Sequence, residues 1–155
     1  MEERLKPVFD ALSAQCAKRE YCSADIRRKA LQRLEFDAAA AEEVVAALVD
    51  EGFVDDRRYA AAFAREKAAL QGWGEVKICF RLREKGISDE IITEALQEID
   101  PAKAASKLDK LAADRYRLLK DDPQCRLKML KALLSRGYGY DEVEAAVNKV
   151  MKTPE

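Results

Sequence analysis

Residues 76–99, VKICFRLREKGISDEIITEALQEI, match residues 127–150, LKMLKALLSRGYGYDEVEAAVNKV, position by position at an offset of 51. Most apolar positions of the two segments coincide, and Gly86 falls on Gly137. Residues 28–51 show the same apolar pattern at an offset of 48 from the first segment. Because internal repeats of this length are typical of stacked structural units, the sequence predicts three copies of one unit.

The spacing of apolar residues within each copy predicts helices, and therefore an all-α fold. Apolar side chains recur every three or four residues, which places them on one face of a helix, and the 155-residue chain has only 6 glycines and 4 prolines. The expected helices cover residues 4–20, 24–34, 38–51, 56–71, 75–85, 89–99, 102–119, 123–136 and 141–151. The expected caps are Ser23, Ser88, Asp100 and Asp122 at helix starts, and Gly52, Gly86 and Gly137 at helix ends.

The repeats divide the chain into an N-terminal helix and three units. A unit with two or three short helices buries little apolar surface alone, so we expect neighbouring units to stack. The predicted architecture is an elongated, right- or left-handed array of tandem three-helix repeats, in which the last repeat is truncated. The expected division is residues 1–20 for the N-terminal helix, 21–71 for repeat 1, 72–120 for repeat 2 and 121–155 for repeat 3.

Composition argues against several classes of function. The chain has no histidine, the residue most used for acid–base catalysis near neutral pH, and we therefore expect no enzyme, no catalytic residue, no metal site and no cofactor. Its 4 cysteines show no paired CxxC spacing, which indicates a reducing compartment. The longest apolar run, Val44 to Val49, is far shorter than the roughly 20 residues of a membrane span. A cytoplasmic location without membrane contact is expected.

The formal net charge of −1 hides an alternation from helix to helix. The first helices of the three copies, over 24–34, 75–85 and 124–136, carry net charges of +3, +2 and +4, whereas the second helices, counted over 38–51, 89–100 and 141–151, carry −4, −5 and −2. One interpretation is that basic and acidic helices of the same unit attract each other and keep the surface hydrated. The other is that the basic helices form a discontinuous positive track for phosphates or for an acidic protein groove.

Two short glycine–aromatic segments, GWG over 72–74 and GYG over 137–139, resemble fragments of phosphate-binding loops. Neither follows a predicted strand, and neither precedes Gly-Lys-Ser or Gly-Lys-Thr, so we interpret both as turns held by an aromatic side chain. Tyr138 and Tyr140 adjoin a basic helix, and we expect them to contact a partner.

The segment GFVDDRRYA over 52–60 is followed by Trp73-Gly74 and by LREKGI over 82–87. Together these segments resemble the central signature of the RecX regulatory proteins, and LLSRGYGYD over 133–141 is similar to the C-terminal repeat of that family. The resemblance covers residues 21–150. The signature residues are Gly52, Phe53, Asp55, Asp56, Tyr59, Trp73, Gly74, Gly86 and Gly137.

We interpret these signature residues as mainly structural, with the two aspartates as helix caps. One departure from the family pattern is the turn LEFD over 34–37, which lacks a glycine. We expect the angle between the two helices on either side of this turn to differ from that in the family.

The resemblance implies a monomeric regulatory protein whose partner is the RecA recombinase filament, with single-stranded DNA inside the filament as a further contact. RecX proteins lie in the filament groove or block its growing end, and they inhibit the recombinase, ATPase and coprotease activities of RecA. The candidate RecA- or DNA-contact residues are Arg27, Arg28, Lys29, Arg33, Lys77, Arg81, Arg126, Lys128, Lys131, Arg136 and Tyr138.

Two other functions stay open on the sequence. A helical DNA-binding or transcriptional protein that acts independently of RecA would bind naked DNA with a steep salt dependence. A structural adaptor would instead present its acidic second helices to a partner.

Overall fold

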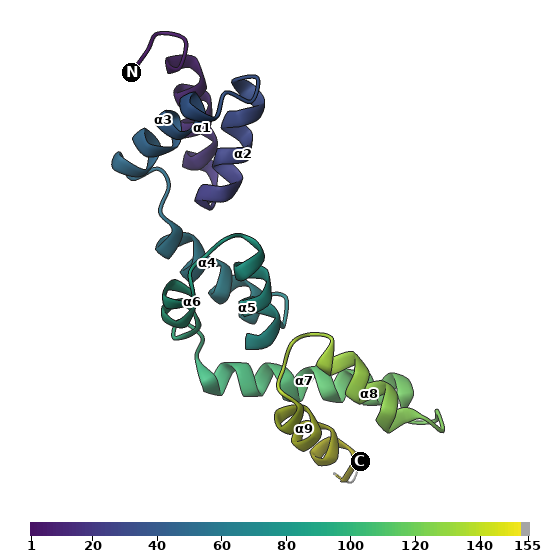
Figure 1. The fold of residues 1–155 in the computed structure, drawn as a ribbon. Coiled ribbons are helices and arrows are strands. Elements are labelled where there is room, and N and C mark those ends of the chain that lie inside the picture. Colours follow the sequence, from purple (N-terminus) through teal and green to yellow (C-terminus); the bar gives the residue numbers. More distant parts are fainter. Residues whose placement is uncertain (153–155) are drawn as a thin grey trace.

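The fold is an elongated array of helices in a computed structural model that describes residues 1–152 (Figure 1). The described residues contain no strand, so the all-α expectation is confirmed. The helices are α1 (Lys6–Lys18), α2 (Ser23–Arg33), α3 (Ala38–Asp50), α4 (Asp56–Ala69), α5 (Glu75–Glu84), α6 (Asp89–Leu96), α7 (Pro101–Leu119), α8 (Cys125–Leu134) and α9 (Tyr140–Lys152). Each helix lies within a few residues of its predicted range.

The helices pack into three units, each with its own apolar core. The first core is built from α1, α2 and α3, and the second from α4, α5 and α6. The third is built from α7, α8 and α9. Figure 1 shows the three units following one another from the N-terminus to the C-terminus, with α7 extending from the second unit into the third.

This grouping corrects the division expected from the sequence, which began each repeat one helix too late. α4 packs on α5 and α6, and α7 packs on α8 and α9; the expected division had assigned α4 and α7 to the preceding repeats. In the same way α1 is the first helix of the first unit and not an added helix. The third unit therefore has three helices and is not truncated.

Helix starts are fixed by side-chain caps at several of the expected positions. Asp55 accepts hydrogen bonds from the amides of Arg57 and Arg58 at the start of α4, at 3.0 and 3.1 Å. Asp100 accepts from the first turn of α7, and Ser88 accepts from the first turn of α6. A cap of this kind is worth about 1 kcal/mol.

Two of the expected caps are wrong. Ser23 lies inside α2, whose N-cap is Cys22, and its hydroxyl donates to Asp56 instead of accepting from α2. Asp122 does accept from the Gln124 amide at 2.8 Å, but α8 begins only at Cys125. The intervening residues form a turn that is not part of the helix.

The turn between α2 and α3 has two residues in the left-handed region. Glu35 has φ 53° and Phe36 has φ 63°, whereas the equivalent turns of the other units use Gly86 and Gly137, with φ 76° and 94°. A non-glycine residue pays about 1–2 kcal/mol for this conformation. The missing glycine therefore leaves the turn in place and adds strain to it.

Candidate interaction surface

The joint between the first and second units combines charged and polar side chains with the buried Cys22. Asp56 of α4 accepts two hydrogen bonds from Ser23, one from its amide and one from its hydroxyl, both at 2.7 Å. Lys85 donates to Asp25 at 2.9 Å, and Cys22 is completely buried in the core of the second unit. Asp56 thus joins the start of α4 to the start of α2, so the expectation that it caps its own helix is corrected.

The contact with Lys85 at this joint determines the ionisation state of Asp25. Burial of the Asp25 carboxyl raises its pKa, but the hydrogen bond and the charge of Lys85 outweigh that effect. The net result is a pKa of Asp25 below its ordinary value. The carboxylate is therefore held ionised where the two units meet.

At the joint between the second and third units, the two backbones are in direct contact. The Gly74 amide donates to the Arg136 carbonyl at 2.8 Å, and the Val76 amide donates to the Gly137 carbonyl at 3.0 Å. A Cβ on Gly74 would lie 2.4 Å from the Gly137 carbonyl oxygen, and one on Gly137 would lie 2.3 Å from Lys77 Cβ. Only glycines allow this approach, so these two signature residues have a structural role.

Trp73 holds the loop before α5 against the second core. Its ring packs edge-on against Phe63 at 6.1 Å between centroids. The ammonium groups of Lys67 and Lys77 lie 5.1 and 4.4 Å from the centroid of the indole ring, an arrangement in which a cation is attracted to the ring face. The interpretation of this loop as a turn with an aromatic anchor agrees with the structure, and Lys77 is engaged by that anchor.

The basic helices α2, α5 and α8 lie along one side of the array in Figure 1, and the acidic helices α3, α6 and α9 lie along the other. Several of the candidate cations on α2 have partners within their own unit. Arg27 pairs with Glu42 of α3, Arg28 lies 3.7 Å from Asp25, and the Lys29 ammonium lies 5.2 Å from the ring centroid of Tyr21.

Several candidate cations of α5 and α8 also have partners. Arg81 pairs with Glu84 at 3.1 Å, and Arg126 contacts Glu144 and Asn148 of α9. Lys128 binds Asp122, and the Arg136 guanidinium donates to the Gln71 carbonyl at 2.6 Å. Such pairs between exposed side chains contribute about 0–1 kcal/mol, so a partner with stronger acceptors can displace them. Attraction within each unit is thus observed for part of the basic set.

Arg33 and Lys131 are exposed and have no ion pair with any residue in the described part of the chain. They leave unneutralised positive charge on α2 and α8, at opposite ends of the array. The three basic helices therefore present a mixture of paired and unpaired cations.

The structure places Tyr138 differently from the expectation. Tyr138 is only 7% exposed and packs in the third core, so it is not available as a surface contact. Burial raises the pKa of its hydroxyl, which has no hydrogen-bond partner among the described residues. Tyr140, two residues further on, is 55% exposed. The ring of Tyr138 takes the core position that Ile87 occupies in the second unit.

Sequence reasoning missed a second set of cations, Lys103, Lys107 and Lys110 on α7. The charges that recur between the predicted repeats lie in their first helices, and these three lysines lie outside those helices. The available signal was their spacing of four and three residues, which puts all three on one face of a helix.

The described residues define an all-α protein of three stacked three-helix units with cations along an extended side. No helix in residues 1–152 is both long and apolar enough to cross a membrane. Residues 55–96, which span α4 to α6, match the family model for the second three-helix domain of RecX, and these boundaries agree with the packing of the second unit.

The regulatory protein RecX of Chlorobium phaeobacteroides is 30% identical over 149 residues, covering 96% of both chains. That of Clostridium tetani is 29% identical over 120 residues, and the match covers 75% of this chain but only 55% of the relative. A crystal structure of RecX from Lactobacillus salivarius superposes with a TM-score of 0.80 at 18% identity, covering 99% of this chain and 100% of the other. The chain belongs to the RecX family of regulatory proteins.

Proposed function

We propose that this chain binds RecA filaments on single-stranded DNA in the cytoplasm and inhibits their recombinase, ATPase and coprotease activities. The observation that carries the proposal is the row of basic helices α2, α5 and α8 along one side of an elongated array (Figure 1). Membership of a family of regulatory proteins supports a role that acts on another macromolecule.

The shape of the molecule suits a helical filament. A filament presents the same surface at regular intervals, and an array of three units meets several of these surfaces at once. Each unit adds only weak contacts, but once one is bound the others act at a high effective concentration. The array could lie in the groove of the filament or block its end. Both modes use contacts distributed along the length of the array.

The proposed contact residues are the cations of the three basic helices, without the buried Tyr138. They are Arg27, Arg28, Lys29, Arg33, Lys77, Arg81, Arg126, Lys128, Lys131 and Arg136. Contacts between these cations and the DNA phosphates inside the filament release counterions from the DNA. This part of the binding free energy therefore weakens as the salt concentration rises.

The first experiment mixes the purified protein with RecA assembled on single-stranded DNA. Co-sedimentation and ATP hydrolysis are followed across a salt series, with DNA alone as the control. The proposal requires binding to the filament and slower hydrolysis at protein concentrations that leave bare DNA unbound. Binding to bare DNA without any effect on the filament supports instead a DNA-binding protein independent of RecA.

A charge reversal on α8 tests the contact surface. We expect the triple variant Arg126→Glu, Lys128→Glu and Lys131→Glu to weaken filament binding at least about tenfold, since three unit charges near a polyanion change sign. Circular dichroism should show unchanged helicity, because all three side chains are exposed. Unchanged inhibition by a folded variant would remove α8 from the contact surface.

A further inference from the structure

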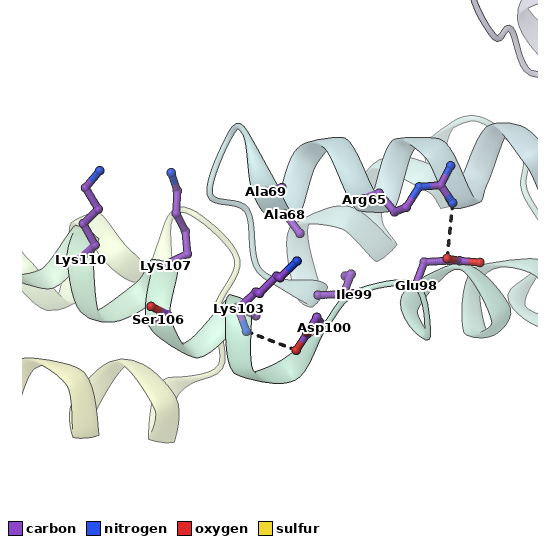
Figure 2. Close-up of a pocket in the computed structure, with 11 residues that line it drawn as sticks. Arg65, Ala68, Ala69, Glu98, Ile99, Asp100, Lys103, Ser106, Lys107 and Lys110 are labelled. Atoms are coloured by element: carbon purple, nitrogen blue, oxygen red, sulfur yellow. Dashed lines mark hydrogen bonds and ion pairs between the residues drawn. The ribbon is translucent and has the colours of Figure 1, made fainter.

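A groove lies between the end of α4 and the beginning of α7, and none of its lining residues belongs to the basic helices α2, α5 and α8. It has a volume of about 550 Å³ and receives residues from α4, from the α6–α7 connection and from α7 (Figure 2). It lies where the second unit meets the third, because α4 packs against α7 there.

The floor of the groove is apolar. It is formed by Ala68 and Ala69 of α4 together with Ile99 and Ala104. The small alanine side chains leave space above the floor, and the surface is without aromatic rings among its lining residues. An apolar side chain from another molecule gains free energy by covering such a surface, at about 25 cal/mol per Å² removed from water.

One rim of the groove carries three lysines of α7. Lys103, Lys107 and Lys110 follow one another at spacings of four and three residues, and Figure 2 shows Lys107 and Lys110 projecting to the same side of the helix. None of the three forms an ion pair with any residue in the described part of the chain. Their Cα atoms extend along about 10 Å of the helix axis.

The carboxylates beside the groove are already engaged. Glu98 pairs with Arg65 at 3.4 Å across the groove, as Figure 2 shows. Asp100 accepts hydrogen bonds from the amides of Ala102 and Lys103, at 2.9 and 3.3 Å. The lining has two carboxylates against four cations, which are Arg65 and the three lysines, so the groove keeps a net positive charge.

A fourth cation lies close to the same rim. A Cβ on Gly72 would lie 3.2 Å from Lys107 Cε and 3.4 Å from Arg136 Nη1, so both side chains pass close to this glycine. Arg136 is held there by its hydrogen bond to the Gln71 carbonyl. The loop between α4 and α5 thus brings a cation of the third unit near the lysines.

We infer that this groove binds an acidic segment of a protein partner, which places an apolar side chain on the alanine floor and carboxylates on the lysine rim. A phosphate backbone would use the rim but gain nothing from the apolar floor, and single-stranded bases would find no ring to stack on. Charge complementarity and the apolar floor together favour an acidic protein segment. The inference rests on the proposed function, in that the segment belongs to the protein subunits of the filament.

The test uses the full chain with two groove variants. The first variant replaces Lys103, Lys107 and Lys110 by glutamine. Its control makes the same change at Lys6, Lys18 and Lys152, three exposed lysines with no ion pair in the described part of the chain. The second, Ala69→Phe, fills the floor without a change of charge; its control is Ala46→Phe at an exposed alanine of α3. We expect both groove variants to bind RecA filaments at least about fivefold more weakly than their controls.

Cross-linking with a carbodiimide supplies a second measurement, because this reagent joins a lysine amine directly to a carboxylate in contact with it. Links from Lys103, Lys107 or Lys110 to aspartate or glutamate of the filament protein support the inference. Filaments bound equally by wild type and both groove variants overturn the inference and leave the proposed function standing. A wild-type chain that ignores filaments overturns both.

Binding to a thymidine oligonucleotide tests whether the groove binds nucleic acid instead of a protein segment. If the lysine variant loses oligonucleotide binding to the same degree as filament binding, and Ala69→Phe changes neither, the occupant is nucleic acid and the inference is wrong. If oligonucleotide binding is unchanged while filament binding falls, the occupant is protein.

Discussion

The two joints of this molecule connect similar units by different means. The first and second units meet through side chains, with Ser23 bound to Asp56 and Lys85 bound to Asp25. The second and third units meet through the backbone at Gly74 and Gly137. A side-chain joint tolerates small shifts and responds to pH, whereas a backbone joint has no space for any substitution. The comparison predicts that substitutions at the second joint cost more stability than substitutions at the first.

The largest effect is expected at the backbone joint. Gly137→Ala places a Cβ 2.3 Å from Lys77 Cβ and 2.5 Å from its amide nitrogen, in a residue with φ 94°. Strain and overpacking together should lower the free energy of unfolding by about 3 kcal/mol or more. Urea unfolding followed by circular dichroism measures the loss.

Gly86→Ala is the matched control, because Gly86 has a similar φ of 76° and nothing within 4 Å of its Cβ position. Its cost should be the strain alone, about 1–2 kcal/mol. Equal losses in the two variants would show that the backbone contact contributes nothing to the joint.

A smaller effect is expected at the side-chain joint. Asp56→Ala removes both hydrogen bonds to Ser23 and leaves a half-buried amide and hydroxyl without partners. The free energy of unfolding should fall by about 2 kcal/mol. Asp55→Ala, which removes only a local helix cap, should cost about 1 kcal/mol. Thermal unfolding of the two variants compares them, and a larger loss for Asp55→Ala would contradict the role given to Asp56.

The smallest effect is the pH dependence of the Asp25–Lys85 pair. The pKa of Asp25 is lowered in the folded protein, so its contribution is present above the unfolded pKa of about 3.9 and is lost as pH falls through the lower folded value. Because Lys85 is 39% exposed, the contribution should be about 1 kcal/mol or less. The difference in unfolding free energy between wild type and Asp25→Asn should therefore shrink below about pH 4. A difference that is constant with pH would exclude the pair as its source.

The sequence predicted the helices but not the start of each unit. Apolar periodicity and caps mark a helix locally, which is why nine ranges agree with the structure. A repeat offset is the same wherever a copy is taken to begin, so it leaves the grouping undetermined. The offset of 48 does relate Leu12 to Ala60 and Leu108, and all three are buried in the first helix of their unit. The same offset therefore identifies the N-terminal helix as the first helix of the first unit.

The candidate site was predicted in part. The cations of α2, α5 and α8 follow from charge counts, but their ion pairs depend on which helices are neighbours in space. Tyr138 was misplaced because an aromatic ring with a hydroxyl suits both a surface and a core. Lys103 and its neighbours on α7 were missed because the comparison of repeats weighed only charges that recur.

The position of Trp73 makes the joint between the second and third units observable without a label. It is the only tryptophan of the chain, it adjoins Gly74, and its indole lies beside the Lys77 ammonium on α5. Its fluorescence emission therefore reports on one place in the molecule. Trp73 lines a pocket together with Gly137 and Tyr138 of the third unit, so separation of the third unit would change the surroundings of the indole and shift its emission. The same emission would distinguish a filament that binds the array intact from one that opens it at this joint.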